Sequence, residues 1–147
     1  MSADLDLVRR LAAAAPLAVV ATARPDGTVH ASLVSAGVLD DPLSAQPVVG
    51  MVVGGATRKL ELLRTSRHAT AVFRNGWEWV SVEGPVRLVG PDDPVEGLDV
   101  AALPGLLRRI FTAAGGTHDD WAEYDRVMVE QRRTAVLIEP ARLLGNG

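Results

Sequence analysis

The segment LAVVATARPDGTVHASLVS, which covers residues 17–35, carries the clearest structural signal in the chain. Residues 17–24 are rich in β-forming side chains, and Pro25-Asp26-Gly27 is typical of a tight turn. Residues 28–35 then alternate polar and apolar side chains, which is the pattern of a strand with one buried face. The segment therefore predicts an antiparallel hairpin.

Four segments after this hairpin also predict strands: residues 48–53, 69–74, 77–89 and 134–139. An irregular loop with two prolines is expected before the first of them, over residues 38–47. Asn75-Gly76 joins the second and the third in the manner of a type I′ turn. With this turn, Trp77 and Trp79 lie on the same face of the strand that follows.

Helical periodicity predicts four helices between the strands, over residues 4–15, 57–66, 103–114 and 117–128. Asp4 and Thr57 are candidate N-caps of the first two, and Thr117 with Asp120 resembles a capping box that opens the fourth. Six short strands interrupted by helices predict a small antiparallel barrel with helical cover.

The composition fits one globular domain that spans residues 1–147, because a second core would leave both halves too small. A net charge of -3 provides no basic field for a polyanion, so nucleic-acid binding is not expected. The chain has no cysteine, which excludes disulfides, thiolate nucleophiles and zinc ribbons. Its three histidines are too scattered for a metal pair, so no metal site is expected.

The apolar run over residues 11–23 superficially resembles a secretory signal. However, Asp4 and Asp6 make its start acidic, Pro16 divides it, and its second half continues into the predicted hairpin. The run is also too short to span a membrane. We therefore expect a cytoplasmic protein that does not bind a membrane.

The stretch from Gly54-Gly55 to Lys59 is the strongest candidate for a binding site. Arg58 and Lys59, the chain's only lysine, fall in the first turn of the predicted helix, where the macrodipole disfavours cations unless an anion is bound. Together with free backbone N–H groups and the Thr57 hydroxyl, they could form a phosphate cradle. The alternative is an amphipathic helix whose basic residues simply point into water.

Other polar or aromatic groups are less specific. Trp77 and Trp79 could wall an aromatic cofactor, although core or interface packing is the more frequent use of such residues. The polar group His118-Asp119-Asp120 is explained by a capped helix start. No hydrolase or metalloprotease motif occurs, so in an enzyme a cofactor would carry the reaction.

Several segments spread over nearly the whole chain resemble one known family. They are ATARPDG (21–27), TRK (57–59) with LR (63–64), WEWVSVEG (77–84), GTHDDW (116–121) and RTAVLIEP (133–140). In this order and spacing they resemble the pyridoxamine 5′-phosphate oxidase-like split-barrel family, specifically its actinobacterial branch of deazaflavin (coenzyme F420)-dependent oxidoreductases. The resemblance implies a mainly β fold, a six-stranded antiparallel split barrel with Greek-key connections and several covering α-helices.

The same resemblance implies a site. Thr57, Arg58 and Lys59 would hold the cofactor phosphate. The cofactor ring would lie near strand residues His30, Ser32, Val34, Met51 and Val52. Members of this family are homodimers with the cofactor at the subunit interface, so a homodimer is expected.

One departure from the family pattern bears on the cofactor. True pyridoxamine phosphate oxidases carry an arginine and a lysine on the strand occupied here by residues 28–35, which offers only His30. Their basic, histidine-containing C-terminal strand is also missing. Vitamin B6 oxidation is therefore not expected, and the deazaflavin is favoured over FMN.

The resulting hypothesis is an F420-dependent reductase that transfers a hydride from the reduced deazaflavin to an unsaturated small organic substrate. The proton could come from solvent, from His30 or from a group of the substrate, and the sequence does not choose among them. The alternatives are an FMN-dependent flavoprotein oxidoreductase on the same barrel and a non-catalytic flavin or haem-type carrier or sensor.

Overall fold

The computed structural model of the protein describes residues 4–146, and six of its strands close an antiparallel barrel. The strands are β1 (Leu17–Ala23), β2 (Val29–Asp40), β3 (Pro47–Val53), β4 (His68–Asn75), β5 (Glu78–Val89), β6 (Thr134–Ile138) and β7 (Arg142–Gly145). Their order around the barrel is β4-β1-β2-β3-β6-β5, and pairing between β4 and β5 closes it. The predicted six-stranded barrel is confirmed, while β7, which pairs with β5, was not predicted.

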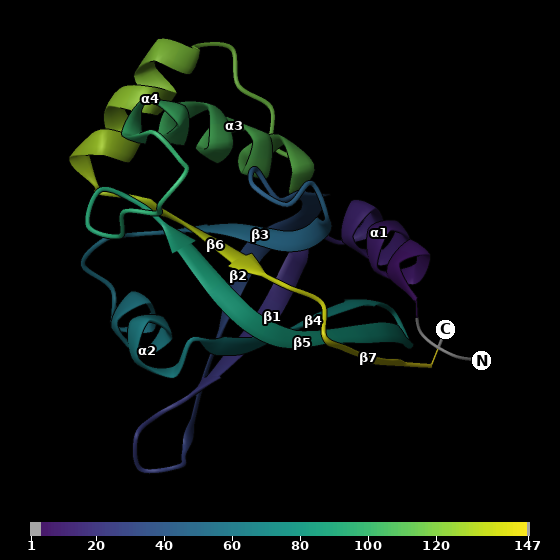
Figure 1. Ribbon diagram of the computed structural model, residues 1–147. Helices are drawn as coiled ribbons and strands as arrows, with labels where there is room; N and C mark the ends of the chain where they lie inside the picture. Colours follow the sequence, from purple (N-terminus) through teal and green to yellow (C-terminus); the bar gives the residue numbers. More distant parts are fainter. Residues whose placement is uncertain (1–3, 147) are drawn as a thin grey trace.

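Helices cover the barrel from several sides. They are α1 (Leu5–Ala14), α2 (Arg58–Ser66), α3 (Leu103–Ala113) and α4 (Trp121–Glu130), with a short 3-10 turn η1 (Val100–Ala102) before α3. Figure 1 shows α3 and α4 together over β3 and β6, with α1 and α2 on other sides of the barrel. No helix within residues 4–146 has the length and apolar character needed to cross a membrane.

The capping predictions are confirmed for two helices and corrected for a third. Asp4 and Thr57 cap α1 and α2, since each side chain accepts a hydrogen bond from a backbone N–H in the first turn. The N-cap of α4 is Asp120 rather than Thr117. The His118 ring accepts the Asp120 N–H at 3.0 Å, which holds the preceding residues outside the helix.

The predicted hairpin of residues 17–35 is present as β1 and β2, paired from Leu17 with Ser35 to Ala23 with Val29. In its turn, Asp26 accepts hydrogen bonds from the Thr28 backbone and hydroxyl, and Gly27 has a φ of 88°, which glycine adopts without strain. The local sequence is therefore sufficient to set this turn.

The second strand continues to Asp40, although a loop was expected from residue 38. Beyond Ser35 it changes partner, and residues 36–40 pair with β3 instead of β1. Gly37 allows α3 to pack closely on this extension, because a Cβ at that position would overlap the Ala113 carbonyl of α3. Pairing between β2 and β3 ends at Ala36 and Met51, where β2 turns to β1, and this parting is the split of the barrel.

The hairpin between β4 and β5 differs from its prediction by one residue. Asn75 pairs with Glu78, so Gly76 and Trp77 form the loop, and β5 begins at Glu78 rather than at Trp77. A loop at Asn75-Gly76 would have set Glu78 opposite the buried Phe73, whereas the observed register gives Phe73 the buried partner Val80. Burial of these side chains thus overrides the local turn signal.

Two apolar clusters hold the structure together. The barrel interior and the buried face of α1 share one cluster, which includes Phe73, Met51 and Leu11. The second lies between the outer face of β3 and β6 and the helices α3 and α4, around Leu137 and Ile110. The helical pair is therefore packed firmly against the side of the barrel where the split begins.

Candidate functional site

A cavity of about 320 Å³ lies where β2 and β3 part. Val34 and Ser35 of β2 and Val52 of β3 form its strand side, and Arg133, just before β6, lies at its polar side. The helices α3 and α4 and the C-cap residue of α3 contribute the other side, with Ile110, Phe111, Ala114, Tyr124 and Met128. Two of the residues expected near a cofactor ring, Val34 and Val52, are thus brought to one cavity.

His30 and Ser32 share the face of β2 that carries Val34. On the neighbouring strand β1, His30 pairs with Thr22 and Ser32 pairs with Val20, and both partner side chains are buried. The His30 Nδ1 and Ser32 Oγ atoms are buried, and neither has a hydrogen-bond partner among residues 4–146. An unpaired buried polar atom costs about 1–3 kcal/mol, so both atoms could gain from a hydrogen bond, but neither residue is among those that line the cavity.

The start of α2 forms as the sequence predicts. The Thr57 hydroxyl donates to the Gly54 carbonyl at 2.9 Å and accepts the Leu60 N–H at 3.3 Å. This hydroxyl therefore fixes the helix start, and its proton is already engaged. The charge available to an anion here comes from the two residues that follow.

Arg58 and Lys59 differ sharply in their surroundings. The Arg58 side chain is 63% exposed and forms an ion pair of 2.9 Å with Glu61. Lys59 is half-buried and has no ion-pair partner among the described residues. Burial first, and the positive charge of Arg133 second, hold the pKa of Lys59 below its usual value of 10.5. Lys59 is therefore a half-buried cation that would be stabilised by a bound anion.

Arg133 is the functional candidate that sequence reasoning missed. Its Nε donates to the neutral side chain of Gln131 at 2.9 Å, and no carboxylate within residues 4–146 pairs with it. It is half-buried, lines the split cavity, and lies close enough to Lys59 to affect its pKa. Two neighbouring cations without a carboxylate form a site of net positive charge.

The two glycines before α2 allow the turn that carries Arg133 to pack against the start of this helix. A Cβ on Gly55 would come within 2.6 Å of the Arg132 carbonyl, and a Cβ on Gly54 would touch the Arg133 guanidinium at 3.9 Å. The Gly55 N–H also donates to the Gln131 carbonyl at 3.1 Å. The Gly54-Gly55 doublet was the sequence signal for this close approach of two turns.

The remaining expected residues lie elsewhere in the chain. Met51 is fully buried inside the barrel, next to Val52 but not in the cavity lining. Trp77 is 93% exposed at the tip of the β4–β5 hairpin. Because β5 begins at Glu78, the prediction that Trp77 and Trp79 share a strand face is wrong. Trp79 is half-buried on β5, where its backbone N–H donates to Asn146. Neither tryptophan lines the split of its own chain.

The outer face of β1 and β2 is unusually apolar. Leu33, Val19, Val72, Ser81 and Leu144 lie in register across β2, β1, β4, β5 and β7. Leu33 is 66% exposed, and the large exposed side chains on this face are Leu17, Val19, Val29, Leu33 and Leu144. An exposed strip that is apolar except for Ser81 is typical of an interaction surface.

Comparison with known proteins supports the fold. No protein-family model matches the chain, and no curated protein matches it by sequence. Among solved structures, a conserved hypothetical protein of Mycobacterium tuberculosis is similar with a TM-score of 0.71 and 18% identity, covering 99% of this chain and 84% of that one.

Two further structures are similar at comparable identity. An F420 reductase matches with a TM-score of 0.61 and 15% identity, over 95% of this chain and 94% of that chain. A pyridoxamine 5′-phosphate oxidase-related, FMN-binding protein of Nostoc punctiforme matches with a TM-score of 0.59 and 14% identity, over 96% and 79% of the two chains. The chain therefore has the split-barrel fold of these proteins, and the resemblance found in the sequence is confirmed at the level of the fold.

Proposed function

We propose that the split binds coenzyme F420 and that the protein is an F420-dependent reductase acting on an unsaturated small organic substrate. The observation that carries the proposal is the pair Lys59 and Arg133, two half-buried cations without a carboxylate partner in residues 4–146, at the start of α2 and beside the cavity. A phosphate bound there gains from both charges and from the N-terminus of the helix.

The cavity suits the rest of such a cofactor. Val34 and Val52, which line the cavity, offer apolar contacts to a flat ring. His30 and Ser32 lie further along the same face of β2, outside the cavity lining, with Nδ1 and Oγ unpaired. When bound in its reduced form, the deazaflavin would supply the hydride. The residues of this chain would bind the phosphate, orient the ring and, through the helices α3 and α4, exclude water from one side of the site.

FMN is the competing occupant, since one structural neighbour is an FMN-binding protein and another is an F420 reductase. The deazaflavin is favoured because residues 28–35 carry no arginine or lysine and His30 is their only ionisable side chain. His30 remains the candidate proton donor, and the substrate itself is left open by the fold.

A second copy of the chain is the proposed partner. The apolar strip around Leu33 lies on the face of the β1–β2 hairpin opposite to His30, Ser32 and Val34, so a dimer formed through it would leave Val34 of each copy free and would bring the cavity residue Ser35, which shares the face of Leu33, towards the interface. A two-fold dimer buries the same strip of both subunits. In this arrangement the cofactor sites lie close to the subunit interface.

The experiment is a screen for oxidation of reduced F420, followed by absorbance, with enones, quinones and tetrapyrroles as acceptors. We expect oxidation that depends on both the protein and an acceptor. A protein that purifies yellow with flavin absorbance would favour the FMN-dependent alternative. Tight binding without oxidation by any acceptor would favour the carrier or sensor.

A further inference from the structure

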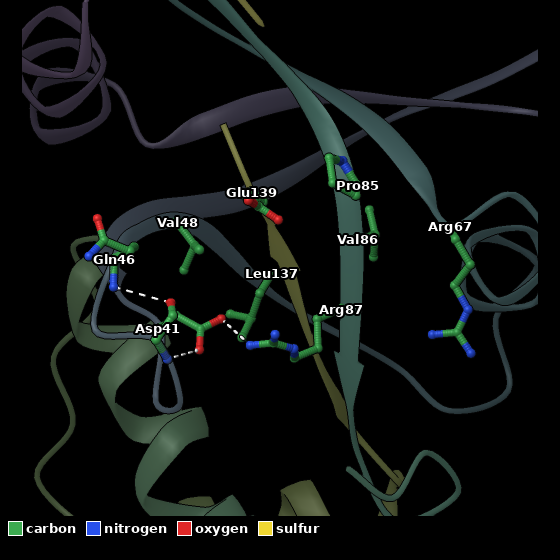
Figure 2. A pocket seen from close by; sticks show the side chains of 10 residues that line it. Asp41, Gln46, Val48, Arg67, Pro85, Val86, Arg87, Leu137 and Glu139 are labelled. Atoms are coloured by element: carbon green, nitrogen blue, oxygen red, sulfur yellow. Dashed lines mark hydrogen bonds and ion pairs between the residues drawn. The ribbon is translucent and has the colours of Figure 1, made fainter. Parts of the chain in front are cut away.

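A second cavity, of about 450 Å³, forms a trough where the loop of residues 41–46 meets β5 and β6. It shares no lining residue with the split cavity. Figure 2 shows the side chains of Asp41 and Gln46 on one side of this trough and that of Arg67 on the other, with Arg87 between them. Nothing in the proposed function uses these groups.

One wall of the trough is a fixed guanidinium. Asp41 is 6% exposed, and its carboxylate accepts the backbone N–H groups of Leu43 and Ser44 at 2.8 and 3.0 Å and bonds Nη1 of Arg87. Burial alone raises the pKa of Asp41, but the hydrogen bonds from Ser44 and Leu43 and the charge of Arg87 outweigh it, so the carboxyl is ionised. Arg87 is thereby held in place, and its other N–H groups have no acceptor within residues 4–146.

The opposite wall is Arg67, which ends α2 in an unexpected conformation. Its φ of 53° lies in the left-handed region, where glycine is the usual residue at a helix end. Its backbone is anchored, because its N–H donates to Leu63 and its carbonyl accepts from Val86, each at 2.9 Å. The guanidinium has no hydrogen-bond or ion-pair partner among the described residues. The Arg67 side chain is exposed, so its donors are available to a ligand, and a left-handed arginine is a backbone outlier of the kind that occurs at ligand sites.

The trough also contains an unpaired acid. Glu139 lines it beside Pro85, and its exposed carboxylate makes no ion pair or hydrogen bond within residues 4–146. The charges of the lining therefore cancel, with two from Arg67 and Arg87 against two from Asp41 and Glu139. A plain anion would be attracted by the arginines but repelled by Glu139.

We propose that this trough binds a small zwitterion of the α-amino-acid type. Its carboxylate lies between the guanidinium groups of Arg67 and Arg87, and its ammonium group lies at Glu139. The Asp41 carboxylate is already satisfied and serves to position Arg87. Such a ligand matches the balanced charges of the lining, which neither a simple anion nor a simple amine does.

The test is a screen of the twenty standard L-amino acids, each at 10 mM, followed by backbone amide NMR of the full chain. We expect at least one to shift signals of residues 41, 43–46, 67 and 139 in a saturable way. The analogue of the best binder that lacks the amino group should bind at least about ten-fold more weakly. Absence of saturable shifts with all twenty, or equal binding of the deaminated analogue, would overturn the proposal.

Variants separate binding from folding. Arg67→Gly relieves the left-handed backbone, so we expect a higher Tm together with about ten-fold or greater loss of amino-acid affinity. Arg132, also left-handed at a φ of 48° but outside the trough, provides the matched control, and Arg132→Gly should bind the amino acid as the unmodified chain does. Unchanged affinity in Arg67→Gly would refute the assignment. Cofactor titration reports on the split independently of these results.

Discussion

Replacing Lys59 by methionine removes the charge at the start of α2 while keeping most of the apolar stem. If Lys59 binds a cofactor phosphate, the loss of one charge-assisted hydrogen bond costs about 1.5–3 kcal/mol, or about a 10-fold to 100-fold higher Kd for F420. Arg58→Met is the matched control. Arg58 is exposed and already paired with Glu61, so its loss should cost at most about 1 kcal/mol of binding.

The same substitution should stabilise the cofactor-free protein. A cation in the first turn of a helix is unfavourable by about 0.3–1 kcal/mol, and Arg133 adds repulsion. Because the pKa of Lys59 is lowered on folding, the unfolded chain holds this proton more tightly than the folded one. The destabilisation caused by the Lys59 charge is complete at pH values below the pKa of Lys59 in the folded protein. It is relieved as the pH rises from that pKa towards 10.5, so the stability advantage of Lys59→Met should shrink over this range.

Two measurements on each variant check this reasoning. Fluorescence titration with F420 gives the Kd, and urea unfolding without cofactor, at pH 7 and above pH 9, gives the free energy of unfolding. We expect Lys59→Met to bind more weakly yet unfold at higher urea concentration. An unchanged Kd in a folded Lys59→Met protein would remove the phosphate site from the account.

Three other substitutions test separate features. If the chain dimerises through this strip as proposed, Leu33→Asp should leave the fold intact but give a monomer mass in light scattering, and a retained dimer mass would contradict the proposed interface. Asp41→Asn should lower the free energy of unfolding at pH 7 by about 1.5–3 kcal/mol. Because the pKa of Asp41 is lowered, this difference should be present above pH 3.8 and shrink as the pH falls below it, as urea unfolding at pH 7 and pH 3 would show. Gly84→Ala places a Cβ against the Glu139 carbonyl and should cost about 1–3 kcal/mol in the same assay, whereas equal stability would refute that close approach.

Features set by neighbouring residues could be predicted from the sequence. The β1–β2 turn depends on Asp26 and Gly27 within the turn itself, and the cap of α2 depends on Thr57 and the backbone three residues later. These contacts are local, so the pattern of residue types was enough to find them.

Features set by distant residues could not be predicted. The register of the β4–β5 hairpin follows from burial of Phe73 opposite Val80, not from the turn residues, and this moved Trp77 out of the strand. Arg133 lies 74 positions after Lys59, and only the folded barrel brings their charges together. The sequence therefore indicated one half of the candidate phosphate site, and the structure supplied the other half.

The central claim is that the split prefers F420, and titration of the purified protein with F420 and with FMN, side by side at one salt concentration, tests it most directly. The charges of Lys59 and Arg133 would serve the phosphate of either cofactor, so the comparison reports on the ring contacts around Val34 and Val52. We expect saturable binding with a lower Kd for F420 than for FMN. Equal or tighter binding of FMN, or no binding of either, would contradict the account.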